Sequence, residues 1–186
     1  PLRRQRQMCI RDRFIPGQVR GRIDETAQMA LRLDAAIAEV PLPNGQRSDA
    51  FARAERAAWE ETGEAYRPAL LADVPLIPAH TALLTTTVYH GSNPPGIVDI
   101  VPSESPRPAG WTAALVIVDG LIGQAVDDGI CQRFSHVPGM PELLLRAVSY
   151  RRHVNDLHSA SRSNTRSHIE RVEQHLVSRA SAILER

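Results

Sequence analysis

The sequence predicts a mainly α-helical fold, a bundle of about five to six helices that ends in an antiparallel helical hairpin. Apolar residues recur at alternating steps of three and four in several long segments, which is the spacing of one helix face. Short stretches rich in Pro, Gly and Ser separate these segments. The chain has 186 residues, the length of one ordinary domain, so we expect residues 14–186 to form a single domain.

The first residues are set apart by their sequence. Residues 5–13, QRQMCIRDR, resemble the translation of a sequencing adapter at the end of a reading frame assembled from environmental DNA. We therefore expect residues 1–13 to be a non-native leader, the alternative being a basic N-terminal tail. They carry five of the 22 basic and one of the 21 acidic residues, which leaves 17 and 20, a net charge of −3. The formal charge of +1 therefore does not indicate a nucleic-acid partner, and no DNA-binding signature is found.

Composition bears on the source genome and on the cellular location that is expected for the protein. All basic residues are Arg, a bias that is typical, together with abundant Ala, of a GC-rich bacterial genome. No run of 18 apolar residues occurs, so no membrane-spanning helix is expected. Outside residues 1–13 the only cysteine is Cys131, which excludes a disulfide framework there and favours a cytoplasmic location.

Two helices are predicted in the first third of the chain. Residues 23–40 place apolar side chains from Met29 to Val40 at helical spacing, and the segment PLPNG ends this helix. Ser48 is expected to cap a second helix, which runs to the break at Pro68.

Residues 80–130 allow two interpretations. The segments HTALLTTTVYH, GIVDIV and AALVIV are rich in Val, Ile and Thr, which would suit a small sheet within residues 80–118. Alternatively, TALLTTTVY and the segment from Trp111 are core helices around an irregular Pro/Ser-rich loop at about residues 91–110. We prefer the helical interpretation because the apolar run from Trp111 is long and unbroken. The loop is long enough to be a lid or a binding loop.

The last stretch, residues 141–186, is expected to form the helical hairpin. Its first apolar stripe consists of Leu143, Ala147, Tyr150, Val154 and Leu157. Its second stripe consists of Ile169, Val172, Leu176, Ala180 and Ile183. Ser167 and Glu170 have the spacing of a capping box at the start of the second helix. Because the connection is short, the two helices should pack antiparallel with their apolar faces together.

The hairpin contains a motif that bears on function. The sequence RRHVNDLH at residues 151–158 resembles the R-x4–6-H signature of the HEPN family of helical ribonucleases. The resemblance is confined to residues 141–186, and implies that Arg152 and His158 meet their counterparts in a dimer and cleave RNA without a metal. A His can act as general acid or base near neutral pH, and an Arg can stabilise charge on the phosphate.

Helix geometry favours a different arginine. Arg151 and His158 are separated by about 20° around an ideal helix, whereas Arg152 lies about 120° from His158. Arg151, Asn155 and His158 would thus form a trio at the edge of the apolar stripe, while Arg152 would point outward and pair with Asp156. The candidate catalytic residues are Arg151, Arg152, Asn155 and His158, and the structural alternative is a solvated helix face.

A second enzymatic interpretation rests on acidic residues. Glu61 and Glu64, followed by Asp119 in a later helix, resemble MazG-like nucleotide pyrophosphohydrolases, in which carboxylates of two helices hold Mg²⁺. That family's second acidic pair is absent, since apolar residues occupy its place. His168 and His175 share a helix face but have no third ligand nearby. We therefore expect no metal and no cofactor.

The sequence leaves three function classes open. The first, which the sequence favours, is a helical interaction or regulatory module, because it requires nothing beyond the apolar stripes. The second is a HEPN-like, metal-independent endoribonuclease that forms a homodimer through its C-terminal helices. The third is the MazG-like hydrolase. The expected partner is accordingly a protein, a second copy of the chain or RNA.

Overall fold

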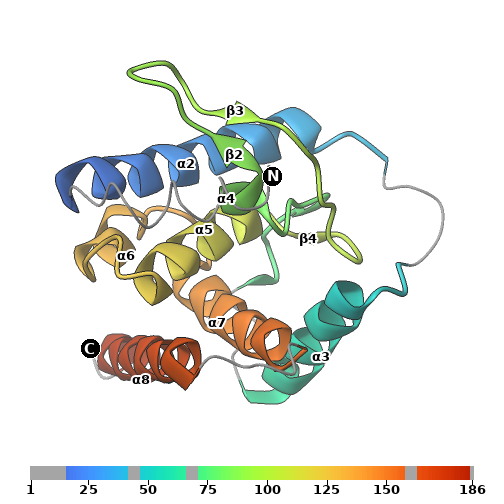
Figure 1. The fold of residues 1–186 in the computed structure, drawn as a ribbon. Coiled ribbons are helices and arrows are strands. Elements are labelled where there is room, and N and C mark those ends of the chain that lie inside the picture. The colour runs from blue at the N-terminus through green and yellow to red at the C-terminus, as the bar shows by residue number, and fades with distance from the viewer. Residues whose placement is uncertain (1–15, 42–46, 66–70, 158–162, 185–186) are drawn as a thin grey trace.

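The computed structural model describes residues 16–41, 47–65, 71–157 and 163–184, and it is mainly helical, as predicted (Figure 1). Its helices are α2 (Pro16–Ile37), α3 (Ala50–Ala65), α4 (Leu83–Thr86), α5 (Trp111–Ile122), α6 (Gly129–Arg133), α7 (Met140–Asp156) and α8 (Ser163–Leu184). Its strands are β1 (Leu76–Ile77), β2 (Thr87–Val88), β3 (Gly96–Ile97) and β4 (Arg107–Pro108). Within these described ranges, no helix combines the length and the apolar content needed to cross a bilayer.

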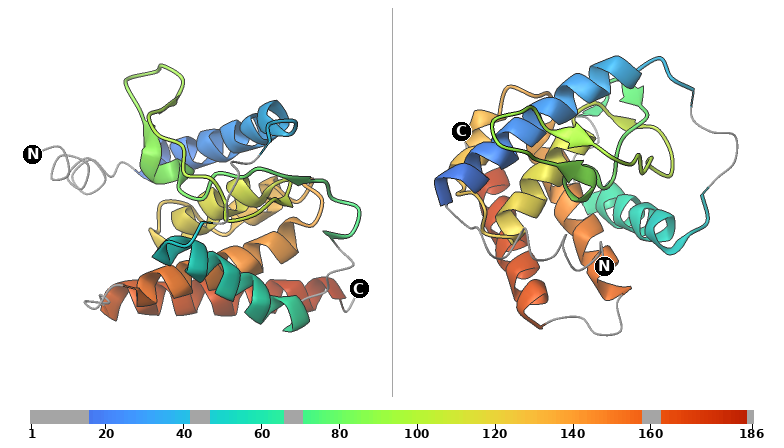
Figure 2. Two further views of the ribbon diagram at one scale, coloured as in Figure 1. Left: turned by 90° about the vertical axis from the view of Figure 1, so that its right-hand side faces the viewer. Right: turned by 45° about the horizontal axis from the view of Figure 1, so that its top comes forward.

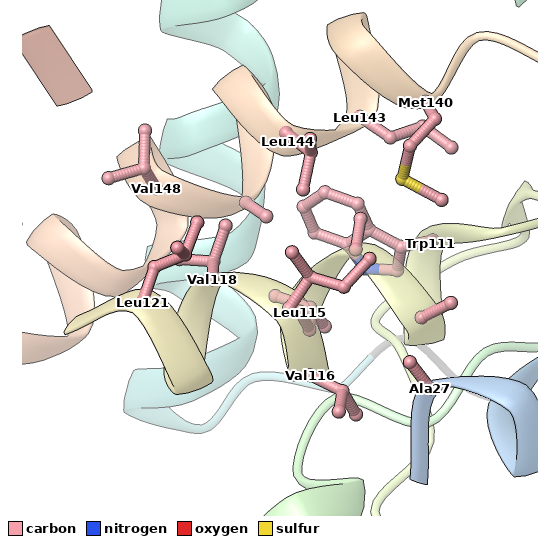
Figure 3. Close-up of a cluster of buried hydrophobic side chains, with 14 of the residues drawn as sticks. Ala27, Trp111, Leu115, Val116, Val118, Leu121, Met140, Leu143, Leu144 and Val148 are labelled. Atoms are coloured by element: carbon pink, nitrogen blue, oxygen red, sulfur yellow. The ribbon is translucent and has the colours of Figure 1, made fainter. Parts of the chain in front are cut away.

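Helix α5 is the centre of the core. Nearly all of its residues are apolar, and a helix that is apolar all round must be covered on every side. It lies in a layer between α2 and α7 (Figure 2, left). Trp111 and Leu115 extend toward Leu144 of α7, while Val116 lies on the side of α5 that faces α2 (Figure 3). The preference for a helix from Trp111 is confirmed, although the helix ends at Ile122.

Small residues let α2 approach α5 closely. Ala27 and Ala30 of α2 are fully buried, and Gly120 of α5 lies against Ile23 of α2. A Cβ atom added to Gly120 would lie 2.8 Å from Cγ2 of Ile23, closer than real Cβ atoms approach a neighbour. The absence of a side chain at Gly120 therefore permits the close approach of the two helices.

Residues 80–118 combine the two interpretations. The segment TALLTTTVY forms one helical turn, α4, and then extends as β2. The change occurs at Thr87, whose backbone is extended and whose hydroxyl donates a hydrogen bond to the Leu83 carbonyl at the start of α4. β2 pairs antiparallel with β3, and β1 pairs antiparallel with β4. The Pro/Ser-rich loop at about residues 91–110 has no regular structure over most of its length, apart from β3 and β4. Two short strands pair it with segments before it in the chain, because backbone donors of a loop that covers the core need partners.

Two predicted helix starts are wrong. The α3 cap is Asp49, whose Oδ1 accepts a hydrogen bond of 3.0 Å from the Ala52 backbone N–H, so Ser48 is not the cap. Helix α8 begins at Ser163, which places Ser167 and Glu170 inside the helix and excludes the capping box. An ion pair of 2.7 Å between Arg166 and Asp156 holds the first turns of α8 to the end of α7.

Helices α7 and α8 form the predicted hairpin, but α7 has a second buried face. The stripe residues Leu143, Ala147 and Tyr150 are buried as predicted, and so are Ile169, Val172 and Leu176 of α8. Leu157, in contrast, is 42% exposed. On the face of α7 next to this stripe, Glu142, Arg146 and Ser149 are also buried, since α3 packs against α7 (Figure 1). The sequence pattern did not predict this contact, because its residues are polar.

Candidate functional site

Arg151, one of the four predicted site residues, is held by an acid of α5. Its Nε and Nη2 atoms donate to Asp119 at 2.6 and 2.7 Å, and Nη2 also donates to the Thr81 carbonyl. The two side chains are only 16% and 18% exposed. Such a bidentate arginine–carboxylate pair is both strong and geometrically defined. Arg151 therefore joins α7 to α5 and to the segment before α4, and its guanidinium is not free to bind a ligand.

Arg152 points to the other side of α7. Its Nη2 lies 2.5 Å from Oε1 of Glu61, on α3, and 3.9 Å from Glu173, on α8. The predicted surface pair with Asp156 is not the one that forms, because Asp156 bonds Arg166 instead. The sequence spacing within α7 could not reveal that α3 brings an acid against this face.

Glu61 accepts hydrogen bonds from three side chains of α7, at positions spaced as i, i+3 and i+4. Besides Arg152, the donors are Nε2 of His153 at 2.7 Å and Oγ of Ser149 at 3.1 Å. Partial burial raises the pKa of Glu61, but the hydrogen bonds from Arg152 and His153 outweigh it and lower that pKa below its usual range. We refer to Glu61, Ser149, Arg152 and His153 as the Glu61 cluster.

A hollow of about 180 Å³ adjoins this cluster between the end of α7 and the start of α8. It is lined by Arg152, Asn155, Asp156, Arg166, Ile169 and Glu170. Asn155, predicted as a site residue, therefore lies beside Arg152 in a polar recess. His158 lies outside the described residues, so the predicted trio of Arg151, Asn155 and His158 stays a prediction.

Two acidic residues of the MazG-like interpretation, Glu61 and Asp119, have other partners. Glu61 is bonded by donors of α7 and Asp119 by Arg151. In the part of the chain that the structure describes, no group of three His, Cys, Asp or Glu side chains is placed to hold a metal ion. The two histidines of α8 face polar side chains: His168 lies 3.3 Å from Gln124, and His175 lies 3.5 Å from Asp128.

Two further ionisable groups are buried near the start of α5. Asp34 accepts a hydrogen bond of 2.8 Å from the Gly110 backbone N–H, and its burial raises its pKa from 3.8 to about 6. His80 bonds the Asp99 carbonyl and the Thr86 hydroxyl, and its burial lowers its pKa. Both side chains tie loop segments to the core. Neither was predicted from the sequence, since a lone Asp or His carries no pattern.

The Glu61 cluster and its hollow thus combine a guanidinium, an imidazole and an amide at the solvent-accessible end of the hairpin. Arg152 is 36% exposed and His153 is 31% exposed. These groups donate hydrogen bonds to oxyanions, and an imidazole also transfers protons near neutral pH. Asp156 and Glu170 also line the hollow, and Arg166 and Arg152 bond Asp156 and Glu61, so an anionic ligand would have to replace a carboxylate there. No protein-family model matches the chain, and neither a curated protein nor a solved structure does.

Proposed function

We propose that the chain is a HEPN-like endoribonuclease that cleaves RNA as a homodimer, without a metal, at the exposed end of its C-terminal hairpin. The observation that carries this proposal is the polar hollow at that end. Arg152 and Asn155, both part of the motif at residues 151–158, line the hollow together with Arg166. His158 follows directly after Leu157, the last described residue of this segment.

The distribution of charge supports an anionic substrate at the hairpin. Residues 141–186 contain eight Arg and five acidic residues, a surplus of three positive charges, and four of the seven His. Residues 14–140 contain nine Arg and fifteen acidic residues, an excess of six negative charges. An RNA backbone would be attracted to the hairpin and repelled by the rest of the domain.

The contacts of the two arginines assign them different roles in the proposal. Arg152 is the phosphate-binding arginine, since it lies beside the hollow and its ion pair with Glu61 is partly exposed, unlike that of Arg151. Arg151 is a structural residue, because Asp119 occupies its guanidinium. Asn155 positions the substrate, and His158 transfers the proton. This assignment agrees with the commoner form of the family motif, in which Arg152 is followed by the polar residue His153.

The test is an RNA cleavage assay in the presence of a chelator. The wild-type protein should cleave single-stranded RNA, and His158→Ala should abolish cleavage while its thermal unfolding is unchanged. His136→Ala is the matched control, since His136 is an exposed histidine of the turn between α6 and α7. Size-exclusion chromatography with light scattering should find a dimer. Cleavage that persists in His158→Ala, or a wild-type protein that does not cleave, would refute the proposal.

A second candidate function is a protein-interaction module, and one surface favours it. The β2–β3 arm and the segment after it expose Val88, Val98 and Ile100 by at least half of their surface. The arm projects from the helical body beside α2 (Figure 1). If this surface binds a protein, Val98→Asp should abolish the interaction and leave RNA cleavage unchanged.

We also propose a cytoplasmic location. The single cysteine of residues 14–186, Cys131, is buried as a free thiol, and its burial raises its pKa. A protonated, buried thiol is unreactive and suits a reducing compartment, where an RNA substrate would also be found.

A further inference from the structure

We propose that the Glu61 carboxylate occupies the place of an RNA phosphate at Arg152 and His153 and competes with RNA for these two groups. The inference rests on the proposed function and adds a regulatory residue to the same site. Glu61 belongs to α3 and therefore lies outside the motif at residues 151–158. It would keep the site closed until RNA displaces it.

The donors around Glu61 are those of an oxyanion site. A guanidinium, an imidazole and a hydroxyl converge on the two carboxylate oxygens, with Arg152 on Oε1 and both His153 and Ser149 on Oε2. Guanidinium groups bind carboxylates and phosphates with the same geometry. Two non-bridging phosphate oxygens can therefore replace the two carboxylate oxygens without moving α7.

The exposure of the ion pair makes this exchange easy. Glu61 is 43% exposed, whereas the neighbouring pair of Arg146 and Glu142 is almost completely buried. An exposed ion pair contributes little net stability, because water solvates the separated charges well. Opening the Glu61 contacts is therefore easier than opening the Arg146 pair, and only the former is accessible to a polyanion.

Ser149 indicates what must take the place of Glu61. This residue is 1% exposed, and its hydroxyl donates to Glu61. If the carboxylate moved into solvent and nothing replaced it, a buried donor would lose that acceptor, which is unfavourable. A phosphate oxygen would restore the bond. The cluster is thus complete with an oxyanion and incomplete without one.

The matched variants are Glu61→Gln and Glu60→Gln. Both remove one negative charge from the end of α3, and Glu60 is exposed. Binding is measured by fluorescence anisotropy with a labelled single-stranded 2′-O-methyl RNA, whose blocked 2′ oxygen prevents cleavage, at low and at physiological salt. Glu61→Gln should lower Kd by up to about fivefold relative to Glu60→Gln, the factor that corresponds to about 1 kcal/mol. Glu61→Ala serves as a second variant with the same expected direction.

The outcomes separate this inference from the proposed function. Equal Kd values for Glu61→Gln and Glu60→Gln, or weaker binding by Glu61→Gln, would overturn the competition. If neither the wild-type protein nor the variants bind RNA, the proposed function fails. The competition at Glu61 is then tested by itself with inorganic phosphate. In an NMR titration, the ring signals of His153 should shift at lower phosphate concentrations in Glu61→Gln than in the wild-type protein or Glu60→Gln. Shifts at the same concentration, or no shifts, would overturn it.

Discussion

The contribution of Asp34 to the stability of this fold should fall as the pH rises through the titration of this residue. Asp34 belongs to α2 and is only 4% exposed, because its side chain lies against the start of α5. Burial raises its pKa to about 6, although hydrogen bonds from the Gly110 backbone and the Thr112 hydroxyl favour the ionised form and partly offset the effect. The folded protein therefore binds a proton at Asp34 more tightly than the unfolded chain, where the pKa is 3.8.

The sign and size of the effect follow from proton linkage. Stability falls with rising pH wherever the folded state holds more protons than the unfolded state, here between pH 3.8 and about 6. Each pH unit in that window changes the free energy of unfolding by about 1.4 kcal/mol. Ionised Asp34 should therefore destabilise the protein at neutral pH by about 3 kcal/mol relative to its protonated form.

The test compares the wild-type protein with Asp34→Asn by urea unfolding at several pH values between about 4 and 7.5. The asparagine has nearly the same shape, can accept the bond from Gly110 N–H, and does not ionise. Its buried NH₂ group adds a cost, but this cost is the same at every pH. The difference in unfolding free energy should shift in favour of Asp34→Asn by about 2.5 kcal/mol from the lower to the upper pH, since at pH 4 the unfolded chain has already lost part of the proton.

A difference between these two proteins that does not change with pH would refute the reasoning. Asp49 provides an internal control of opposite sign. Slight burial raises its pKa, but hydrogen bonds from the Ala52 backbone and Arg47 outweigh this and lower it. Its contribution is therefore present above its unfolded pKa and is lost as the pH falls, so Asp49→Asn should lose its effect on stability in acid.

Four further variants test the contacts described above, each by urea unfolding. Arg151→Met should lower the unfolding free energy by about 2–4 kcal/mol, since it leaves Asp119 partly buried without its cation; wild-type stability would show that the pair is not structural. Gly120→Ala should cost about 1–3 kcal/mol, because its Cβ would meet Ile23 2.8 Å away, and an unchanged midpoint would contradict that contact. Asp49→Ala should cost about 1 kcal/mol as the loss of a helix cap. Ser48→Ala should leave the unfolding free energy unchanged. If Ser48→Ala instead cost more than Asp49→Ala, Ser48 would be the helix cap, as the sequence predicted.

The sequence by itself indicated the longer helices and determined which apolar faces of the C-terminal hairpin meet. Leu143, Ala147 and Tyr150 are buried where their spacing predicts, because apolar side chains at helical period leave one face that water must not reach. The continuous apolar run from Trp111 likewise favoured a buried helix, which the structure has as α5. Both are properties of local periodicity, which a single chain carries in its order of residues.

Only the tertiary structure decided which polar groups meet. Arg151 faces Asp119, and Arg152 faces Glu61, although each acid is at least 32 residues away in the chain. Ion pairs and hydrogen bonds between side chains depend on how helices cross, and helical spacing within α7 contains no information about α3 or α5. The same reason explains why the buried carboxyl of Asp34 and the hydroxyl of Ser149 were not predicted: what surrounds a polar group is fixed by packing between helices.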